Sequence, residues 1–262
     1  MPDARMAPGV PQLLASQRAA ALRDVRYDLS LDVTRADVAT GRVIVRFTQR
    51  TAREVILDFR GLAITAITAN GRPLTADPTV WSRAHVRIPA SHARAGTNEI
   101  TLEFTTPIAA AGASIIRSRD ASDGADYLYT LLVPSDANLL FPCFDQPDLK
   151  AHVTLSITAP AQWSVMANGA PTGVDTLPSG VRHRFAETQP MSTYLIAFAA
   201  GPYAKLQRQV SIANGAAPVP MDLWLRASRL KEVEADSLVT MNAQALRWLG
   251  DWFGVRYPFG KY

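Results

Sequence analysis

The sequence predicts a mainly β domain, built as an antiparallel β-sandwich, with one long helix near its C-terminal end. Polar and apolar residues alternate in Tyr27–Val33, as they do in a strand with one buried face. Turn signals separate such segments, and Asn70-Gly71 is the dipeptide typical of a tight hairpin. Short strands joined in this way favour antiparallel sheets that pack face to face. Beyond Leu225 the apolar residues follow helical spacing instead.

A short helix over Pro11–Leu22 is the first expected element, because its Leu, Ala, Gln and Arg residues are good helix formers. The alternating pattern then predicts a first group of strands at Tyr27–Val33, Arg42–Thr48, Ile64–Ala69, Arg72–Leu74, His85–Ile88 and Asn98–Phe104. From Pro107 to Asp126 small and charged residues replace the alternation, which predicts a long loop. A second group of strands is expected at Tyr127–Val133, His152–Ala159, Trp163–Ala167, Val181–Phe185, Tyr194–Ala199, Lys205–Ile212 and Met221–Leu225.

A long amphipathic helix is expected over Arg229–Phe253, where apolar residues recur every three or four positions. Ser228 is a candidate N-cap. Gly254 is a candidate for the residue that ends the helix, and Pro258 follows as a stop. These signals divide the chain into a helical lead-in at 1–25, a β domain at 26–225 and the start of a second domain at 226–262.

The composition is that of an ordinary globular protein, with 48% hydrophobic and 19% charged residues. A net charge of +4 and a pI of about 9.4 would suit nucleic-acid binding. The arginines are spread singly through strand-like segments, however, so no nucleic-acid partner is expected. No stretch approaches the roughly 18–20 apolar residues that cross a bilayer, so no membrane span is expected. Met1–Arg5 lacks the apolar core of a signal peptide, which predicts a cytoplasmic protein, or a periplasmic or secreted one if a leader has been removed.

The segment Phe141–Ala151 carries the most information in the sequence. Pro142 and Pro147 fix φ and lack an N–H donor on either side of Cys143 and Asp145. We expect a rigid, aromatic-rich structural corner in which Asp145 accepts backbone N–H hydrogen bonds. As the single cysteine, Cys143 excludes an internal disulfide framework. It has no histidine nearby in the sequence to activate it, so we expect a buried structural thiol rather than a nucleophile.

This corner resembles the one in the N-terminal domain of the aminopeptidase N family of zinc metallopeptidases. Three further stretches match that family in the expected order, namely Arg117–Thr130, the PMSTYL-type segment Pro190–Phe198, and Trp252–Tyr262. The resemblance implies a saddle-like antiparallel β domain that packs on a thermolysin-like catalytic domain, whose first helix would lie in residues 226–262. In that second domain an H-E-x-x-H motif and a later Glu bind one zinc and activate water.

The zinc motif of that family is absent from this sequence, because none of the histidines (His85, His92, His152 and His183) is followed by glutamate. We therefore expect no cofactor in this chain and no catalysis by it alone, with zinc in the missing catalytic domain. His183 and Glu187 share a strand face but lack a third ligand. The acidic residues of Asp120–Asp126 miss the spacing of a calcium loop.

The resemblance implies that the chain walls the substrate cleft of an enzyme that removes N-terminal residues from peptides. Its partners would be the catalytic domain in the same polypeptide and peptide N-termini. A non-catalytic β-sandwich module for binding or scaffolding is the alternative, and a family member without peptidase activity is another. The codons beyond Tyr262 would discriminate, since an H-E-x-x-H motif there supports the enzyme and a stop codon supports the module.

Three residues are candidates for substrate binding: Tyr129, Leu131 and Val133. The resemblance implies that their strand approaches the cleft, where relatives usually place Gln and, two positions later, often an acidic residue. This chain has Leu131 and Val133 at those positions, and a strand would direct both to one face. They either form a more apolar first substrate pocket or are core residues in a slightly different register.

Overall fold

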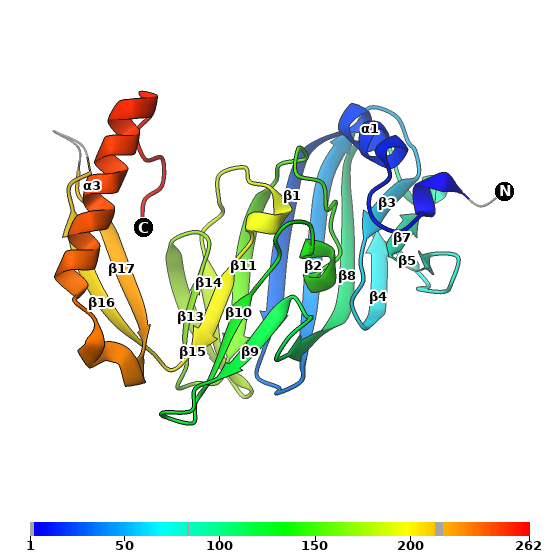
Figure 1. The fold of residues 1–262 in the computed structure, drawn as a ribbon. Coiled ribbons are helices and arrows are strands. Elements are labelled where there is room, and N and C mark those ends of the chain that lie inside the picture. Colours follow the sequence, from blue (N-terminus) through cyan, green and yellow to red (C-terminus); the bar gives the residue numbers. More distant parts are fainter. Residues whose placement is uncertain (1–2, 83, 213–216) are drawn as a thin grey trace. The chain divides into compact units, whose positions relative to one another are not determined.

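In the computed structural model, which describes residues 3–82, 84–212 and 217–262, the chain is mainly β, as the alternating pattern predicts (Figure 1). It divides into two compact units. The first contains Met1–Ser118 and Tyr127–Ala200, and the second contains Arg119–Asp126 and Gly201–Tyr262. Residues 1–2 of the expected lead-in lie outside the described residues. Among the described residues no helix is long and apolar enough to cross a membrane.

The first unit holds most of the strands. Its earlier elements are η1 (Ala4–Met6), α1 (Gln12–Ala21), β1 (Leu22–Asp32), β2 (Val38–Gln49), β3 (Val55–Asp58), β4 (Ala63–Ala69), β5 (Arg72–Leu74), β6 (Trp81–Ser82), β7 (His85–Ile88), η2 (Ala90–His92) and β8 (Gly96–Ala109). Its later elements are β9 (Ile115–Arg119), β10 (Asp126–Thr130), α2 (Ala137–Leu140), β11 (His152–Ala159), β12 (Ser164–Ala167), β13 (Pro171–Leu177), β14 (Gly180–Phe185), η3 (Thr193–Leu195) and β15 (Phe198–Gly201). Helix α1 confirms the helix expected over Pro11–Leu22.

The strands form two sheets in this unit. The larger, of twelve strands, has the order β12-β15-β10-β9-β8-β2-β1-β11-β14-β13, with β4 beside β8 and β5 beside β4. The smaller has the order β3-β7-β6. Most pairs are antiparallel, whereas β1 pairs with β11 and β8 with β9 in parallel. Between β4 and β5, Asn70 and Gly71 have φ values of 53° and 79°, which confirms the predicted tight turn.

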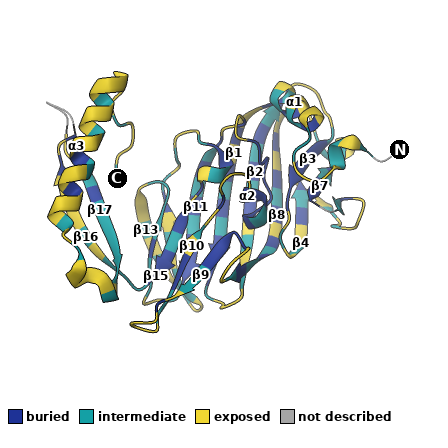
Figure 2. Cartoon of the chain, in the orientation of Figure 1, coloured by how far each residue is buried: buried dark blue, intermediate teal, exposed yellow. Residues whose placement is uncertain are grey.

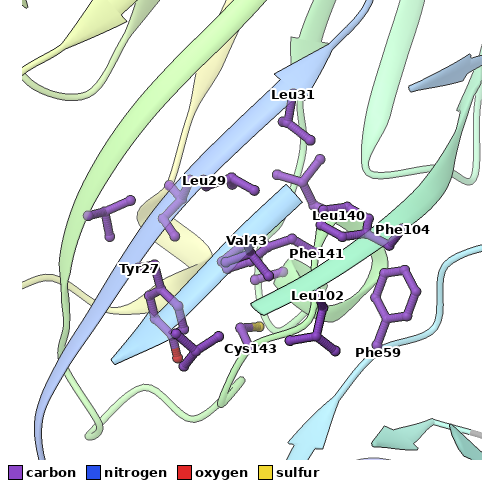
Figure 3. Close-up of a cluster of buried hydrophobic side chains, with 14 of the residues drawn as sticks. Tyr27, Leu29, Leu31, Val43, Phe59, Leu102, Phe104, Leu140, Phe141 and Cys143 are labelled. Carbon is purple, nitrogen blue, oxygen red and sulfur yellow. The ribbon is translucent and has the colours of Figure 1, made fainter. Parts of the chain in front are cut away.

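Side chains from both sheets meet in one hydrophobic core. Along β1, Tyr27, Leu29 and Leu31 are buried while the residues between them are partly exposed, and Figure 2 shows the same alternation in neighbouring strands. Phe59, just after β3, packs edge-on against Phe104 of β8, with ring centroids 5.3 Å apart (Figure 3). Burial of a side chain of this size contributes about 1.5–3 kcal/mol, so the core links the two sheets firmly.

The second unit is a hairpin covered by a helix. Its elements are β16 (Tyr203–Val210), β17 (Val219–Arg226), η4 (Ala227–Glu232) and α3 (Ala235–Phe253). β16 and β17 pair antiparallel, from Tyr203 opposite Arg226 to Val210 opposite Val219. Val239 and Ala243 of α3 pack against Met221 of β17 in a small separate core.

The helix of this unit begins later than the sequence predicts. η4 occupies the first part of the expected range Arg229–Phe253, and Glu234 rather than Ser228 precedes α3. The Ser228 hydroxyl instead donates to the Asp120 carboxylate at 2.8 Å. Together with the bonds from Ser122, this contact holds the pKa of Asp120 well below its usual range. Gly254 adopts a left-handed φ of 66° and ends the helix, as predicted.

Two other segments differ from their predictions. The expected loop Pro107–Asp126 contains the end of β8 and all of β9, because Ile108 and Ile115 pair in parallel register and are both buried. The expected strand Tyr194–Ala199 begins with the 3-10 turn η3, and β15 starts only at Phe198.

Candidate functional site

The candidate residues Tyr129, Leu131 and Val133 all lie at the surface, with exposed fractions of 39%, 55% and 61%. Leu132 is buried between the last two. β10 ends at Thr130, so the prediction that Leu131 and Val133 lie within the strand is wrong. Neither is a core residue of the described chain. All three side chains are exposed to solvent, and we refer to these residues together as the 129–133 row.

Hydrogen bonds of Thr130 and Leu131 define where β10 ends within this row. The Thr130 hydroxyl accepts a hydrogen bond from the Phe198 N–H at 3.1 Å, which closes the pairing of β10 with β15. The next amide, that of Leu131, donates at 2.9 Å to the carbonyl of Ser114, which immediately precedes β9 on the other side of β10. The backbone then turns towards α2, where the Asp136 N–H donates to the Leu132 carbonyl. The row is therefore paired with β15 at its first residue and followed by a hydrogen-bonded turn that leads into α2.

The corner around Asp145 holds the far end of this segment. Its buried carboxylate accepts hydrogen bonds from the backbone N–H of Asn138 at 3.1 Å, from the Asn138 side-chain amide at 2.5 Å and from the Thr193 hydroxyl at 2.7 Å. The prediction that Asp145 accepts a backbone N–H bond is confirmed. The neighbouring Pro147 carbonyl accepts the Ser192 hydroxyl at 2.7 Å, while Pro142 is buried within the corner.

A buried ion pair lies behind the corner. Arg18 of α1 donates to both carboxylate oxygens of Asp58, at 2.7 and 2.8 Å, and also to the Ile56 carbonyl. Burial alone would raise the pKa of Asp58, but hydrogen bonds from His85 and Arg18 outweigh it and lower the pKa. The Asp145 N–H donates to Asp58 at 2.9 Å, which connects the ion pair to the corner.

Cys143 is fully buried, as the sequence predicts for a structural thiol. Its backbone pairs with that of Asp58 in both directions, and Figure 3 places it within the core cluster that contains Tyr27. The Tyr27 hydroxyl accepts the N–H of Phe144 at 2.9 Å. Burial, followed by the charge of Asp145, raises the pKa of the Cys143 thiol well above its usual range. A thiol held in its neutral form is a poor nucleophile.

Arg60 connects the corner to the segment that follows the row. Its guanidinium donates to the Asn138 side chain at 2.5 Å and to the Asp136 carboxylate at 2.7 Å. The segment that follows the row is therefore held by paired polar groups. Sequence reasoning identified Asp145 but missed Arg18, Asp58 and Asn138. No local signal marks these residues, since their partners lie in other elements.

The described residues contain no group of three or more His, Cys, Asp or Glu side chains that could hold a metal ion. Glu187, one of the weaker metal candidates, binds Arg26 at 2.5 Å. Asp120, the first residue of the other candidate segment, is bonded to Ser122 and Ser228.

Comparison with known proteins finds one matching family and several related aminopeptidases. Residues 24–195 match the family model described as the peptidase M1 N-terminal domain. The chain is 30% identical to aminopeptidase N of Streptomyces lividans over 253 residues, which cover 95% of this chain and 28% of that protein. It is 27% identical to leucine aminopeptidase 2 of Neurospora crassa, covering 74% and 30%, and 25% identical to glutamyl aminopeptidase of Rattus norvegicus, covering 92% and 26%. The chain thus spans less than a third of the length of these relatives.

Proposed function

Because the chain belongs to the peptidase M1 N-terminal domain family, we propose that it is the N-terminal β domain of an aminopeptidase N-like zinc metallopeptidase. The intact protein removes N-terminal residues from peptides, and this domain walls one side of the substrate cleft without taking part in the chemistry. The observation that carries the proposal is the exposed apolar 129–133 row, which is followed by a segment held by paired polar groups. An apolar surface of this kind is suited to a substrate side chain.

In this proposal Leu131 and Val133 select the substrate by shape and hydrophobicity. Neither side chain carries a hydrogen-bonding group, so neither binds the ammonium group of a peptide N-terminus. The catalytic domain binds that group, while the two side chains exclude water beside the first substrate side chain. Each buried methylene contributes about 0.8 kcal/mol, which favours bulky apolar N-terminal residues over alanine.

The proposal also assigns the parts of the chain. Residues 26–225 are the β domain that follows the lead-in at 1–25, and residues 226–262 are the start of the catalytic domain. The exposure of Met241, Trp248 and Trp252, each more than half exposed, supports a further domain that covers α3, while β16, β17 and α3 themselves lie in one compact unit. An apolar helix face of this width is normally covered in a globular protein, and a catalytic domain in the same polypeptide would cover it. That domain would also bind the zinc that activates water.

The test compares the product of the whole reading frame with the chain 1–262, both purified and assayed on alanyl and leucyl chromogenic amides. We expect the intact product to bind one zinc per chain and to hydrolyse both amides. A chelator should abolish the activity and added zinc should restore it, whereas the chain 1–262 should neither bind zinc stoichiometrically nor hydrolyse. An intact product without zinc and without hydrolysis would overturn the proposal in favour of a binding or scaffold module.

A further inference from the structure

His85 of β7 is buried between two hydrogen-bond acceptors. Its Nδ1 lies 2.9 Å from a carboxylate oxygen of Asp58, and its Nε2 lies 2.9 Å from the backbone carbonyl oxygen of Ala7. An ionised carboxylate and a carbonyl can only accept hydrogen bonds. A neutral imidazole has a single N–H, so one of the two contacts would bring two lone pairs together. Only the doubly protonated imidazolium can donate to both.

The charges around the ring support this protonation state. The charged groups that face His85 are Asp58 from β3 and Arg18 from α1. A second carboxylate, that of Asp145, lies next in the network, since its own N–H donates to Asp58. With His85 protonated, two buried cations therefore match two buried carboxylates. The N-terminal segment contributes only the neutral Ala7 carbonyl to this site, because Asp3 pairs with Arg87.

The contact with Ala7 joins the segment 3–11, which precedes α1, to the buried ring of His85. The other ion pairs that bind this segment, Asp3 with Arg87 and Arg5 with Glu54, are partly exposed to solvent. Partly exposed ion pairs contribute little to stability, about 0–1 kcal/mol each. The imidazolium bond to Ala7 is partly buried and its donor is the buried His85 ring, and a charge-assisted hydrogen bond of this kind is stronger than a neutral one.

We propose that His85 is a pH-sensitive latch, which as an imidazolium fastens residues 3–11 to the β sheet and releases them when it loses a proton. Burial alone would lower the pKa of His85, but the bonds to Asp58 and Ala7 outweigh it and raise the pKa. A raised pKa means that the latch contributes fully below the ordinary value of about 6.5 and is lost as the pH rises through the value in the folded protein. The latch does not depend on the proposed function.

The experiment is a nuclear magnetic resonance titration of the ¹⁵N-labelled chain 1–262 between pH 5.5 and 9. We expect both ring nitrogens of His85 to carry protons at neutral pH. Amide exchange of residues 4–10, corrected for the intrinsic pH dependence, should be constant at low pH. Between the ordinary pKa and the pKa in the folded protein, its opening constant should rise about tenfold per pH unit.

A His85→Gln variant should exchange faster in this segment at low pH and lose the corrected pH dependence, whereas the control His92→Gln should behave as the parent. If His85→Gln fails to fold, the titration of the parent still decides. A His85 ring with one proton at neutral pH would overturn the proposal. A segment whose corrected exchange does not change while His85 titrates would also overturn it.

Discussion

The corner around Asp145 and the helix α3 differ in whether their side chains find partners within their own unit. In the corner, buried polar groups find partners within the same unit, with Asp145 bonded to Asn138 and Thr193. α3 has 19 residues, of which only Val239 and Ala243 are buried. Figure 2 shows most of the rest as exposed. The corner is therefore complete within this chain, whereas the apolar face of α3 is not covered by the described residues.

This difference predicts two kinds of mutational effect, one on folding stability and one on the contacts of the surface. Substitutions in the corner should act on the folding of the chain itself, because they leave buried groups without partners. Substitutions on the exposed face of α3 or in the 129–133 row should hardly change its stability and should act on what the surface contacts. Measurements of stability and of association therefore test whether the corner is self-sufficient and whether the face of α3 lacks a partner.

The largest effect is expected from the buried ion pair. Asp58→Ala leaves Arg18 and His85 buried without their carboxylate, which should cost about 3–5 kcal/mol in the free energy of unfolding. Urea denaturation measures this change. The control is Glu99→Ala, which removes the exposed ion pair with Arg46 and should change stability by about 0–1 kcal/mol. Equal, small effects of both substitutions would contradict a self-sufficient corner.

A smaller loss is expected from Thr193→Val, which keeps the shape of the side chain but removes the bond to Asp145. A hydrogen bond to a charged group is worth roughly 1.5–3 kcal/mol, so the melting temperature should fall measurably. Thr176→Val on the exposed face of β13 is the matched control and should change stability by less than about 0.5 kcal/mol. An unchanged melting temperature for Thr193→Val would show that the corner tolerates an unpaired acceptor.

On α3, the stacked rings of Trp248 and Trp252 lie 5.3 Å apart and are both exposed. Replacing both with Gln should leave the stability of the chain 1–262 within about 0.5–1 kcal/mol of the parent. It should reduce self-association, measured by analytical ultracentrifugation. Val174→Gln, at an equally exposed apolar position on β13, should not change association. A cooperative loss of structure in the double variant would show that the face already has a partner within the chain.

The smallest effect on stability is expected from Leu131→Gln, because the side chain is exposed. In the intact protein, the ratio of kcat/KM for leucyl over alanyl amides should fall, by about tenfold if Leu131 contacts the substrate. Leu13→Gln on α1 is a control of similar exposure that should leave the ratio unchanged. A large drop in melting temperature with unaltered specificity would instead show that Leu131 is a packing residue of the intact protein.

Local signals in the sequence predicted the parts of the fold that local backbone geometry decides. The hairpin at Asn70-Gly71 and the helix end at Gly254 both depend on left-handed φ values, which glycine and asparagine adopt readily. The buried state of Cys143 follows from its residue type and neighbours. These features require no knowledge of distant partners.

The parts that could not be predicted depend on contacts between distant segments. Arg18 and Asp58 are 40 residues apart and, in the sequence, each looks like a surface residue. The alternation of apolar side chains continues to Val133 although the strand ends at Thr130, where the Thr130 hydroxyl accepts the Phe198 N–H and the Leu131 amide bonds to Ser114. Only tertiary structure decides where such a backbone bond is made.

The buried state of Cys143 has a practical consequence for labelling. The chain contains no other cysteine, and its thiol is inaccessible and held neutral. A cysteine introduced at Leu131 or Trp252 would therefore be the one site that reacts with a maleimide dye in the folded chain. Paired dyes or spin labels at those two positions would report, without any background substitution, when a ligand or another domain covers either surface.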